Sequence, residues 1–226
     1  MNKFVTLDIE TLGTPGDCGT THVVMPSAAF VVWKGVQELP TIIYCGFDVR
    51  EQLFQGAKVS AGTIAFWMKE AMSGNQAATT LISELNDKPM SAYRIWNPSN
   101  DGGSIPATNE DIFKAIVAHM VFNNYNSLRF YGNGPDFDMT IYEANSYHAN
   151  KGIPSVPWAF WNIRSARNAN EHDVVMADIK KDAEVWAHRV FKEYNIISST
   201  NHTPSKHNPI YDALVEAYII AQTCEA

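Results

Sequence analysis

Two carboxylates lie two residues apart in the first apolar segment of the chain. Asp8 and Glu10 alternate with Leu7 and Ile9, and a strand over Phe4–Glu10 would place both carboxylates on one face. Their spacing along that strand would be about 6–7 Å. In a central strand such a pair is costly unless a cation lies between the two carboxylates. An edge strand with a solvated face is the alternative, and the pair alone does not decide between them.

A second candidate carboxylate follows the Gly-rich segment Gly132-Asn-Gly-Pro-Asp-Phe-Asp138. The apolar segment Leu128–Tyr131 before this turn predicts a strand, and Asp136–His148 after it predicts a helix. Asp136 is predicted at the N-cap, where its charge complements the helix dipole. Asp138 could instead face the strand end, where active sites of α/β proteins collect.

The third candidate is the segment His207-Asn-Pro-Ile-Tyr-Asp212. Asn208 is a favourable N-cap and Pro209 a favourable first helical residue, so Asp212 is predicted in the first turn of a helix. His207 would lie just outside that helix. A surface histidine beside a capping motif is the alternative. His202, in a polar segment, is predicted to be solvated and to have no role.

Hydrolysis of a phosphodiester is a reaction that these residue types could support. It needs an activated water, charge relief at the phosphoryl group and stabilisation of the leaving oxygen, which two cations about 3.5–4 Å apart supply. Carboxylate oxygens suit Mg²⁺ or Mn²⁺, whereas the absence of clustered Cys and His argues against zinc. A histidine that is largely neutral at working pH can accept the proton of the water.

The elements that must position these residues follow from hydrophobic periodicity and turn residues. A segment of three strands with short connections predicts an antiparallel meander, and the later alternation of strands and helices predicts β–α units. Together they predict a mixed sheet with helices on its faces. The predicted strands are residues 4–10, 27–33, 39–47, 128–131 and 157–163, and the predicted helices are residues 63–71, 76–85, 108–124, 136–148, 180–194 and 209–223, with a loop at 98–106.

Taken together, the three segments resemble one family. They occur in the chain order of DEDD-superfamily 3′→5′ exonucleases of the DEDDh type, which are similar to proofreading exonucleases. The resemblance extends to the phage exonuclease A branch, in which a tryptophan-containing helix (here residues 63–69) and a W-N-x-R-x-x-R segment also occur. It covers about residues 3–222. One departure is Ser165 in the segment Trp161–Arg167, where related sequences often carry an aspartate.

The resemblance implies an α/β fold of the ribonuclease-H-like type, a mixed β-sheet flanked by helices, as a single domain over residues 1–226. It also implies that His207 is the general base and that Thr11 and Leu12 contact the 3′-terminal nucleotide. Two Mg²⁺ or Mn²⁺ ions would be held by the carboxylates of Asp8, Glu10, Asp138 and Asp212.

Further substrate-binding candidates lie on the predicted helix at 63–71 and on a basic turn. Phe66 and Trp67 are adjacent and so point in different directions, and one is expected in the core while the other stacks on a base. We take Trp67 as the substrate-binding candidate. Arg164 and Arg167 are three residues apart and could contact phosphate groups, although a solvated surface is the alternative.

Charge limits the class of partner. Seventeen Lys and Arg against 24 Asp and Glu give a net charge of −7, which excludes a protein that coats nucleic acid nonspecifically. An enzyme that meets phosphate through bound cations is not excluded. We expect a nucleic-acid partner with a single-stranded 3′ end, with DNA favoured by the phage branch. The alternatives are an RNA-trimming enzyme of the same fold, a catalytically silent nucleic-acid-binding relative, and a metal-dependent phosphatase or nucleotidase.

The sequence also bears on location. No apolar run reaches the ~18 residues of a membrane helix, and the N-terminus becomes acidic before a signal-peptide core develops. Cys18, Cys45 and Cys224 are too far apart to predict a metal pair or a disulfide framework. We therefore expect no membrane partner and a cytoplasmic location, which would be the host cytoplasm if the chain is phage-encoded. A homo-oligomer is possible but is not readable from the sequence.

Overall fold

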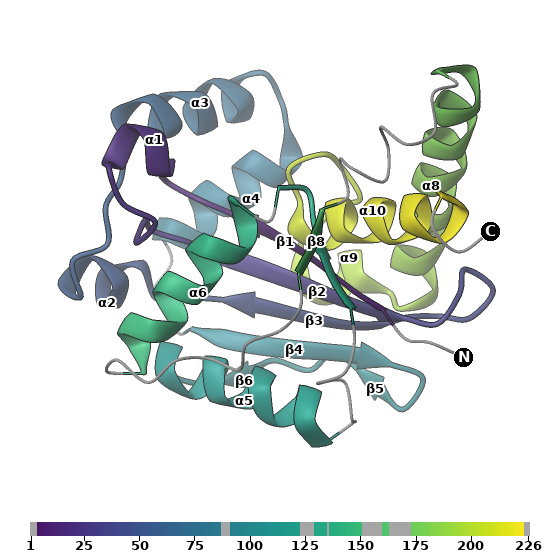
Figure 1. The fold of residues 1–226 in the computed structure, drawn as a ribbon, viewed down its shortest axis with the longest axis horizontal. Helices are drawn as coiled ribbons and strands as arrows, with labels where there is room; N and C mark the ends of the chain where they lie inside the picture. Colours follow the sequence, from purple (N-terminus) through teal and green to yellow (C-terminus); the bar gives the residue numbers. More distant parts are fainter. Residues whose placement is uncertain are drawn as a thin grey trace.

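The computed structural model describes residues 4–86, 91–122, 129–134, 136–150, 160–162 and 173–223. These residues form a mixed β-sheet with helices on both faces (Figure 1), which confirms the predicted α/β fold of the ribonuclease-H-like type. The strands are β1 (Phe4–Glu10), β2 (Ser27–Trp33), β3 (Thr41–Gly46), β4 (Ala92–Asn97), β5 (Asn100–Asp101), β6 (Ile105–Pro106), β7 (Arg129–Gly132) and β8 (Phe160–Asn162). The helices are α1 (Pro15–Cys18), α2 (Val49–Phe54), α3 (Ala61–Met72), α4 (Gln76–Asn86), α5 (Asn109–Phe122), α6 (Asp138–Ala149), α8 (Asp173–Glu193), α9 (Ile196–Thr200) and α10 (Pro209–Thr223).

Strand β1 lies in the interior of the sheet, whose order is β5-β4-β3-β2-β1-β7-β8, with β6 paired to β4. It is antiparallel to β2 over its whole length and parallel to β7 from Phe4 to Leu7. The pairing with β7 ends where Leu7 meets Gly132, so Asp8 and Glu10 extend beyond it. The edge-strand alternative for the carboxylate pair is therefore wrong. The pair lies at the carboxyl ends of two parallel strands, where the strand direction changes across the sheet.

Successive side chains of β1 point to opposite faces of the sheet and belong to two different hydrophobic cores. Val5, Leu7 and Ile9 pack against α5 and α6, whereas Phe4 packs on the opposite face with α8 and α10. The Thr6 hydroxyl donates a hydrogen bond of 2.8 Å to the carbonyl oxygen of Ala213 in α10. Because side chains two residues apart share a face, Asp8 and Glu10 point to the α10 side. A polar pair at the end of an otherwise buried strand thus faces the start of α10.

Helices α3 and α4 form a separate small core beyond the end of β1. Leu12, Val24 and Trp67 belong to it, together with Ala78 and Leu81 of α4. In Figure 1, α3 lies next to α1, past the end of β1. Phe66 and Trp67 of α3 line one hollow together with Glu10.

The structure differs from the predicted elements in several places, and the short helices α1, α2 and α9 were not predicted. A fourth meander strand, β4, was missed, and the predicted loop at residues 98–106 contains the short strands β5 and β6. Helix α6 begins at Asp138, its N-cap is Phe137, and no side chain caps it. The prediction that Asp136 is the N-cap is therefore wrong, and this residue is exposed in the preceding turn. None of the described helices is both long and apolar enough to cross a membrane.

Candidate active site

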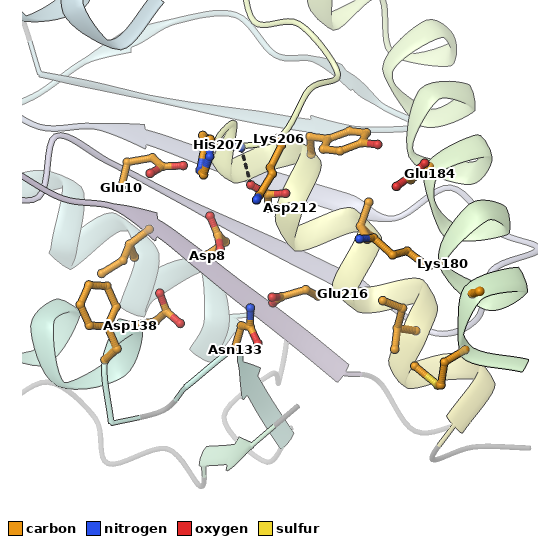
Figure 2. A pocket seen from close by; sticks show the side chains of 17 residues that line it. Asp8, Glu10, Asn133, Asp138, Lys180, Glu184, Lys206, His207, Asp212 and Glu216 are labelled. Atoms are coloured by element: carbon orange, nitrogen blue, oxygen red, sulfur yellow. Dashed lines mark hydrogen bonds between the residues drawn. The ribbon is translucent and has the colours of Figure 1, made fainter. Parts of the chain in front are cut away.

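The four carboxylates that the sequence singled out line one cleft. Asp8 and Glu10 come from the end of β1, Asp138 from the first residue of α6, and Asp212 from the first turn of α10 (Figure 2). The cleft has a volume of about 760 Å³. Glu10 is only 8% exposed and Asp138 only 6%, so these charges are withdrawn from water. Segments from both halves of the chain therefore build one acidic site.

The electrostatics of the cleft favour a cation. Burial raises the pKa of Asp8 well above its usual value, and the charges of Asp212, Glu10, Asp138 and Glu216 raise it further. Burial also raises the pKa of Glu10, again with contributions from Asp212 and Asp138. Burial raises the pKa of Asp212 to about 6, although the His207 backbone N–H and two lysines act in the other direction. A cluster of oxygen donors that repel one another fits hard divalent cations such as Mg²⁺ or Mn²⁺.

His207 lies beside these carboxylates. One ligand-type atom from each of Glu10, His207 and Asp212 lies within 4.8 Å of the other two. The His207 backbone N–H donates to Asp212 Oδ2 at 2.8 Å, and its φ of 70° is left-handed. Burial and Lys206 lower the pKa of His207, with partial compensation from Glu70. The ring is therefore neutral near pH 7 and able to accept a proton. It is not a solvated surface histidine.

Two aromatic residues of α3 contact the His207 ring. Phe66 and Trp67 both meet it edge-on, with centroid distances of 5.3 and 5.7 Å. Trp67 is 4% exposed, and its Nε1 donates to the Thr11 carbonyl oxygen at 2.8 Å. Trp67 is therefore largely a core residue that ties α3 to the end of β1, although it also lines a hollow beside the cleft, and its stacking on a base stays a prediction. Phe66, which is 40% exposed, is the more accessible of the two to a ligand.

A second, smaller hollow adjoins the cleft. It has a volume of about 380 Å³ and shares Glu10 and His207 with the cleft. Thr11, Phe66 and Trp67 are among its lining residues, and the contact of Thr11 with a terminal nucleotide stays a prediction. Leu12 is 7% exposed and packs in the α3–α4 core, so its side chain is not part of this wall.

Sequence reasoning missed several residues of the cleft, among them residues with polar side chains. Glu216 is 3% exposed and lies one turn after Asp212 on α10, a spacing that could have indicated it. Asn133 belongs to the Gly-rich segment before α6, and Lys180 and Lys206 bring positive charge to the acidic cleft (Figure 2).

The expectations for Arg164, Arg167 and His202 have different outcomes. Arg164 and Arg167 lie outside the described residues. His202 is 5% exposed, so the prediction that it is solvated is wrong. Residues of α4 and β3 cover it, and a hydrophilic stretch of sequence cannot reveal such long-range contacts.

Comparison with known families supports the geometry. The family model described as the 3′-5′ exoribonuclease Rv2179c-like domain matches residues 3–224. This match spans the described fold from β1 to α10 and includes every residue of the cleft. A search among curated proteins found no significant match.

Proposed function

Because the chain belongs to the family of Rv2179c-like 3′-5′ exoribonuclease domains, we propose that it removes nucleoside 5′-monophosphates stepwise from the 3′ end of RNA. The observation that carries this proposal is the convergence of Asp8, Glu10, Asp138 and Asp212 beside His207. This is the residue set that the resemblance to DEDDh exonucleases implies. The resemblance of the sequence favoured DNA. The family description names RNA, which was the alternative, and RNA is therefore the substrate proposed here.

The chain's own residues suit this reaction. Two Mg²⁺ or Mn²⁺ ions, held by the four carboxylates, would supply charge relief at the phosphoryl group and lower the pKa of the attacking water. The neutral ring of His207 would accept the proton of that water. Lys180 and Lys206 line the same cleft and would offset the charge of the phosphates that enter it. A net charge of −7 is compatible with this substrate because cations, rather than a basic surface, meet the phosphate.

The smaller hollow would receive the terminal nucleoside. Phe66 is exposed there and would stack on the base, a contact that tolerates any base because each has a π-face. Thr11 and Thr14 line the same hollow, and their hydroxyls would contact the sugar. Arg164 and Arg167 stay candidates for contacts with phosphates upstream of the scissile bond.

The proposal is tested with 5′-labelled oligonucleotides of one sequence, made as RNA and as DNA, incubated with Mg²⁺. A ladder of products shortened by one nucleotide at a time, formed faster from RNA, is the expected result. Faster degradation of DNA would instead support DNA as the substrate, as the sequence resemblance favoured. Intact oligonucleotides together with hydrolysis of mononucleotides would indicate a phosphatase, and binding without cleavage would indicate a catalytically silent protein.

A further inference from the structure

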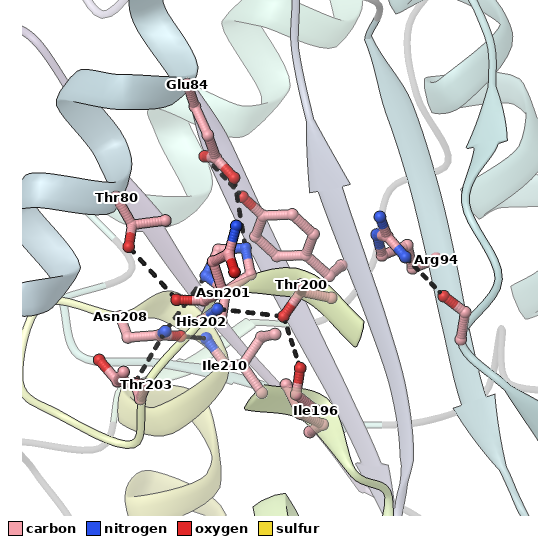
Figure 3. Close-up of polar contacts among 12 residues, drawn as sticks. Thr80, Glu84, Arg94, Ile196, Thr200, Asn201, His202, Thr203, Asn208 and Ile210 are labelled. Carbon is pink, nitrogen blue, oxygen red and sulfur yellow. Dashed lines mark hydrogen bonds and ion pairs between the residues drawn. The ribbon is translucent and has the colours of Figure 1, made fainter. Parts of the chain in front are cut away.

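A second histidine lies buried behind the active-site turn. His202 is 5% exposed, and its ring meets the ring of Tyr44 on β3 edge-on at a centroid distance of 4.4 Å. Both ring nitrogens have polar neighbours, Asn208 on one side and Glu84 on the other (Figure 3). A buried imidazole carries one donor and one acceptor when neutral, so its neighbours determine where the proton lies.

The cap of α10 fixes the orientation of the Asn208 amide. Its Oδ1 accepts hydrogen bonds from the backbone N–H groups of Ile210 at 3.0 Å and Tyr211 at 3.4 Å. The amide nitrogen must then point away from the helix, where it donates to the Thr203 carbonyl oxygen at 3.0 Å and faces His202 Nδ1 at 3.2 Å. Ambiguity between oxygen and nitrogen of an amide is removed in this way by its hydrogen bonds.

The orientation of this amide fixes the tautomer of His202. An amide nitrogen donates and does not accept, so Nδ1 of His202 must accept and the proton lies on Nε2. Nε2 faces Glu84 Oε1 at 3.4 Å, and Glu84 Oε2 accepts from the Tyr44 hydroxyl at 3.2 Å. A continuous polar chain therefore runs from Glu84 of α4 through His202 to Asn208 at the start of α10 (Figure 3).

This chain ends directly beside the catalytic turn. Asn208 follows His207, whose left-handed φ of 70° is a sparsely populated conformation that persists only where the surroundings hold it. Asp212 holds the backbone of His207 and Asn208, because its Oδ2 accepts from the His207 N–H and its own N–H donates to the Asn208 carbonyl oxygen at 2.9 Å. His202 contacts the side-chain amide of Asn208.

Helix α4 and the residue before it hold the same segment at two further points. Asn75, which caps α4, donates from Nδ2 to the Lys206 carbonyl oxygen at 3.4 Å. Thr80 donates to the Asn201 carbonyl oxygen, also at 3.4 Å. These contacts are long, whereas the bonds of Asn208 to Thr203 and Ile210 are of ordinary length. The buried Asn208 amide thus holds the segment with shorter hydrogen bonds than Asn75 and Thr80 do.

We propose that His202, as its neutral Nε2–H tautomer, is a positioning residue that fixes the Asn208 amide and thereby the direction of the His207 ring. It touches no substrate and acts through His207. The effect on rate rests on the proposed nuclease function, whereas the tautomer and the ring contacts of His207 do not.

The rate test uses two substitutions that separate shape from hydrogen bonding. His202→Phe keeps a ring against Tyr44 but removes the acceptor, and we expect kcat to fall about 10- to 100-fold with KM within about twofold. His202→Asn places an acceptor oxygen near the position of Nδ1 and should recover most of kcat, although its smaller side chain lowers the melting temperature more than Phe does. A kcat that follows melting temperature across the two variants would overturn the proposal.

A double-mutant cycle tests whether His202 acts through His207. In a His207→Ala background, His202→Phe should change kcat by less than about twofold, because its target is already absent. A loss as large as in the wild-type background would overturn the positioning role. The matched control is His22→Phe, which replaces another buried histidine, 6% exposed and stacked on His148, and should leave kcat unchanged.

Two NMR measurements test the tautomer of His202 and the position of the His207 ring without relying on nuclease activity. Long-range ¹H–¹⁵N correlation at pH 7 should show His202 as the Nε2–H tautomer, and NOEs should connect the His207 ring to Phe66 and Trp67. These NOEs should weaken in His202→Phe and persist in His202→Asn. An Nδ1–H tautomer or an imidazolium, or NOEs unchanged in His202→Phe, would contradict the proposal. A wild-type protein that does not cleave RNA would instead refute the proposed function.

Discussion

At the residue scale, substitutions of the two nearby carboxylates Asp136 and Asp138 test which of them belongs to the active site. Asp138 is 6% exposed in the cleft, whereas Asp136 is exposed and caps no helix. Asp138→Asn is nearly isosteric, and we expect it to lower kcat by more than about 10³ with little change in melting temperature. Asp136→Asn should change neither quantity. Rates measured on both purified variants decide the assignment, and an inactive Asp136→Asn beside an active Asp138→Asn would refute it.

The pH dependence of the reaction belongs to His207. Burial and Lys206 lower the pKa of this ring from 6.5, so its neutral form persists to lower pH than that of a free histidine. In the pH–rate profile of kcat, the midpoint of the acid limb assigned to His207 should therefore lie below pH 6.5. His207→Ala should cost about 10²–10⁴ in kcat and remove that limb. A profile unchanged in the variant would show that another group is the base.

Several site residues could be predicted from the sequence, and the reason is local. Asp8 and Glu10 share a strand face because the side-chain period of a strand is two, and Asn208-Pro209 predicts the start of the helix that carries Asp212. The burial of His202 could not be predicted, because Glu84 and Tyr44 are remote in sequence. The contacts that bury His202 overturn the expectation that it is solvated, and its positioning role is a proposal.

At the element scale, helix α3 presents two adjacent aromatic residues with different tasks. Phe66→Ala should raise KM about tenfold with kcat nearly unchanged, because it removes a stacking surface worth roughly 1–3 kcal/mol per base. Trp67→Phe keeps the packing but removes the hydrogen bond to the Thr11 carbonyl oxygen, and should lower the free energy of unfolding by about 1 kcal/mol. Steady-state kinetics and denaturant melts measure these effects. An unaltered KM in Phe66→Ala would remove Phe66 from the substrate site.

The missed and misplaced elements have physical explanations. Strand β4 carries Arg94 two residues before the fully buried Trp96, and this charge interrupts the apolar alternation. In the structure, Nη1 of Arg94 donates a hydrogen bond to the Gly102 carbonyl oxygen at 3.0 Å. Asp136 has the residue type of an N-cap, but the backbone N–H groups of Phe137 and Asp138 both donate to the Gly134 carbonyl oxygen. The turn therefore includes Asp136 and delays the helix, which residue preference alone does not reveal.

At the scale of the whole molecule, the acidic cleft makes stability depend on pH and on cations. The folded-state pKa of Asp212, about 6, lies above its ordinary value of 3.8, and that of Asp8 is also raised. The folded state therefore binds more protons than the unfolded state, and this contribution is lost as pH rises through about 6. We expect the melting temperature of metal-free protein to fall between pH 5 and 8 through this contribution.

Mg²⁺ should reverse this loss because it binds only the folded cluster and competes with protons. The increase in melting temperature on adding Mg²⁺ should be larger at pH 8 than at pH 5. His22 acts in the other direction, since its folded pKa of about 4 lowers stability as pH falls from 6.5. Scanning calorimetry of wild-type protein and of His22→Phe separates the two. A melting temperature that Mg²⁺ does not change at either pH would contradict a metal site in the cleft.

The most direct test of the central claim is the degradation of 5′-labelled RNA by wild-type protein and by Asp8→Asn, each with Mg²⁺ and with excess EDTA. We predict a stepwise ladder from the wild-type protein with Mg²⁺ and none with EDTA. The Asp8→Asn protein should remain folded and lose more than about 10³ of the rate. Degradation in excess EDTA, or a near-wild-type rate from Asp8→Asn, would contradict the claim that these carboxylates hold the cations for hydrolysis.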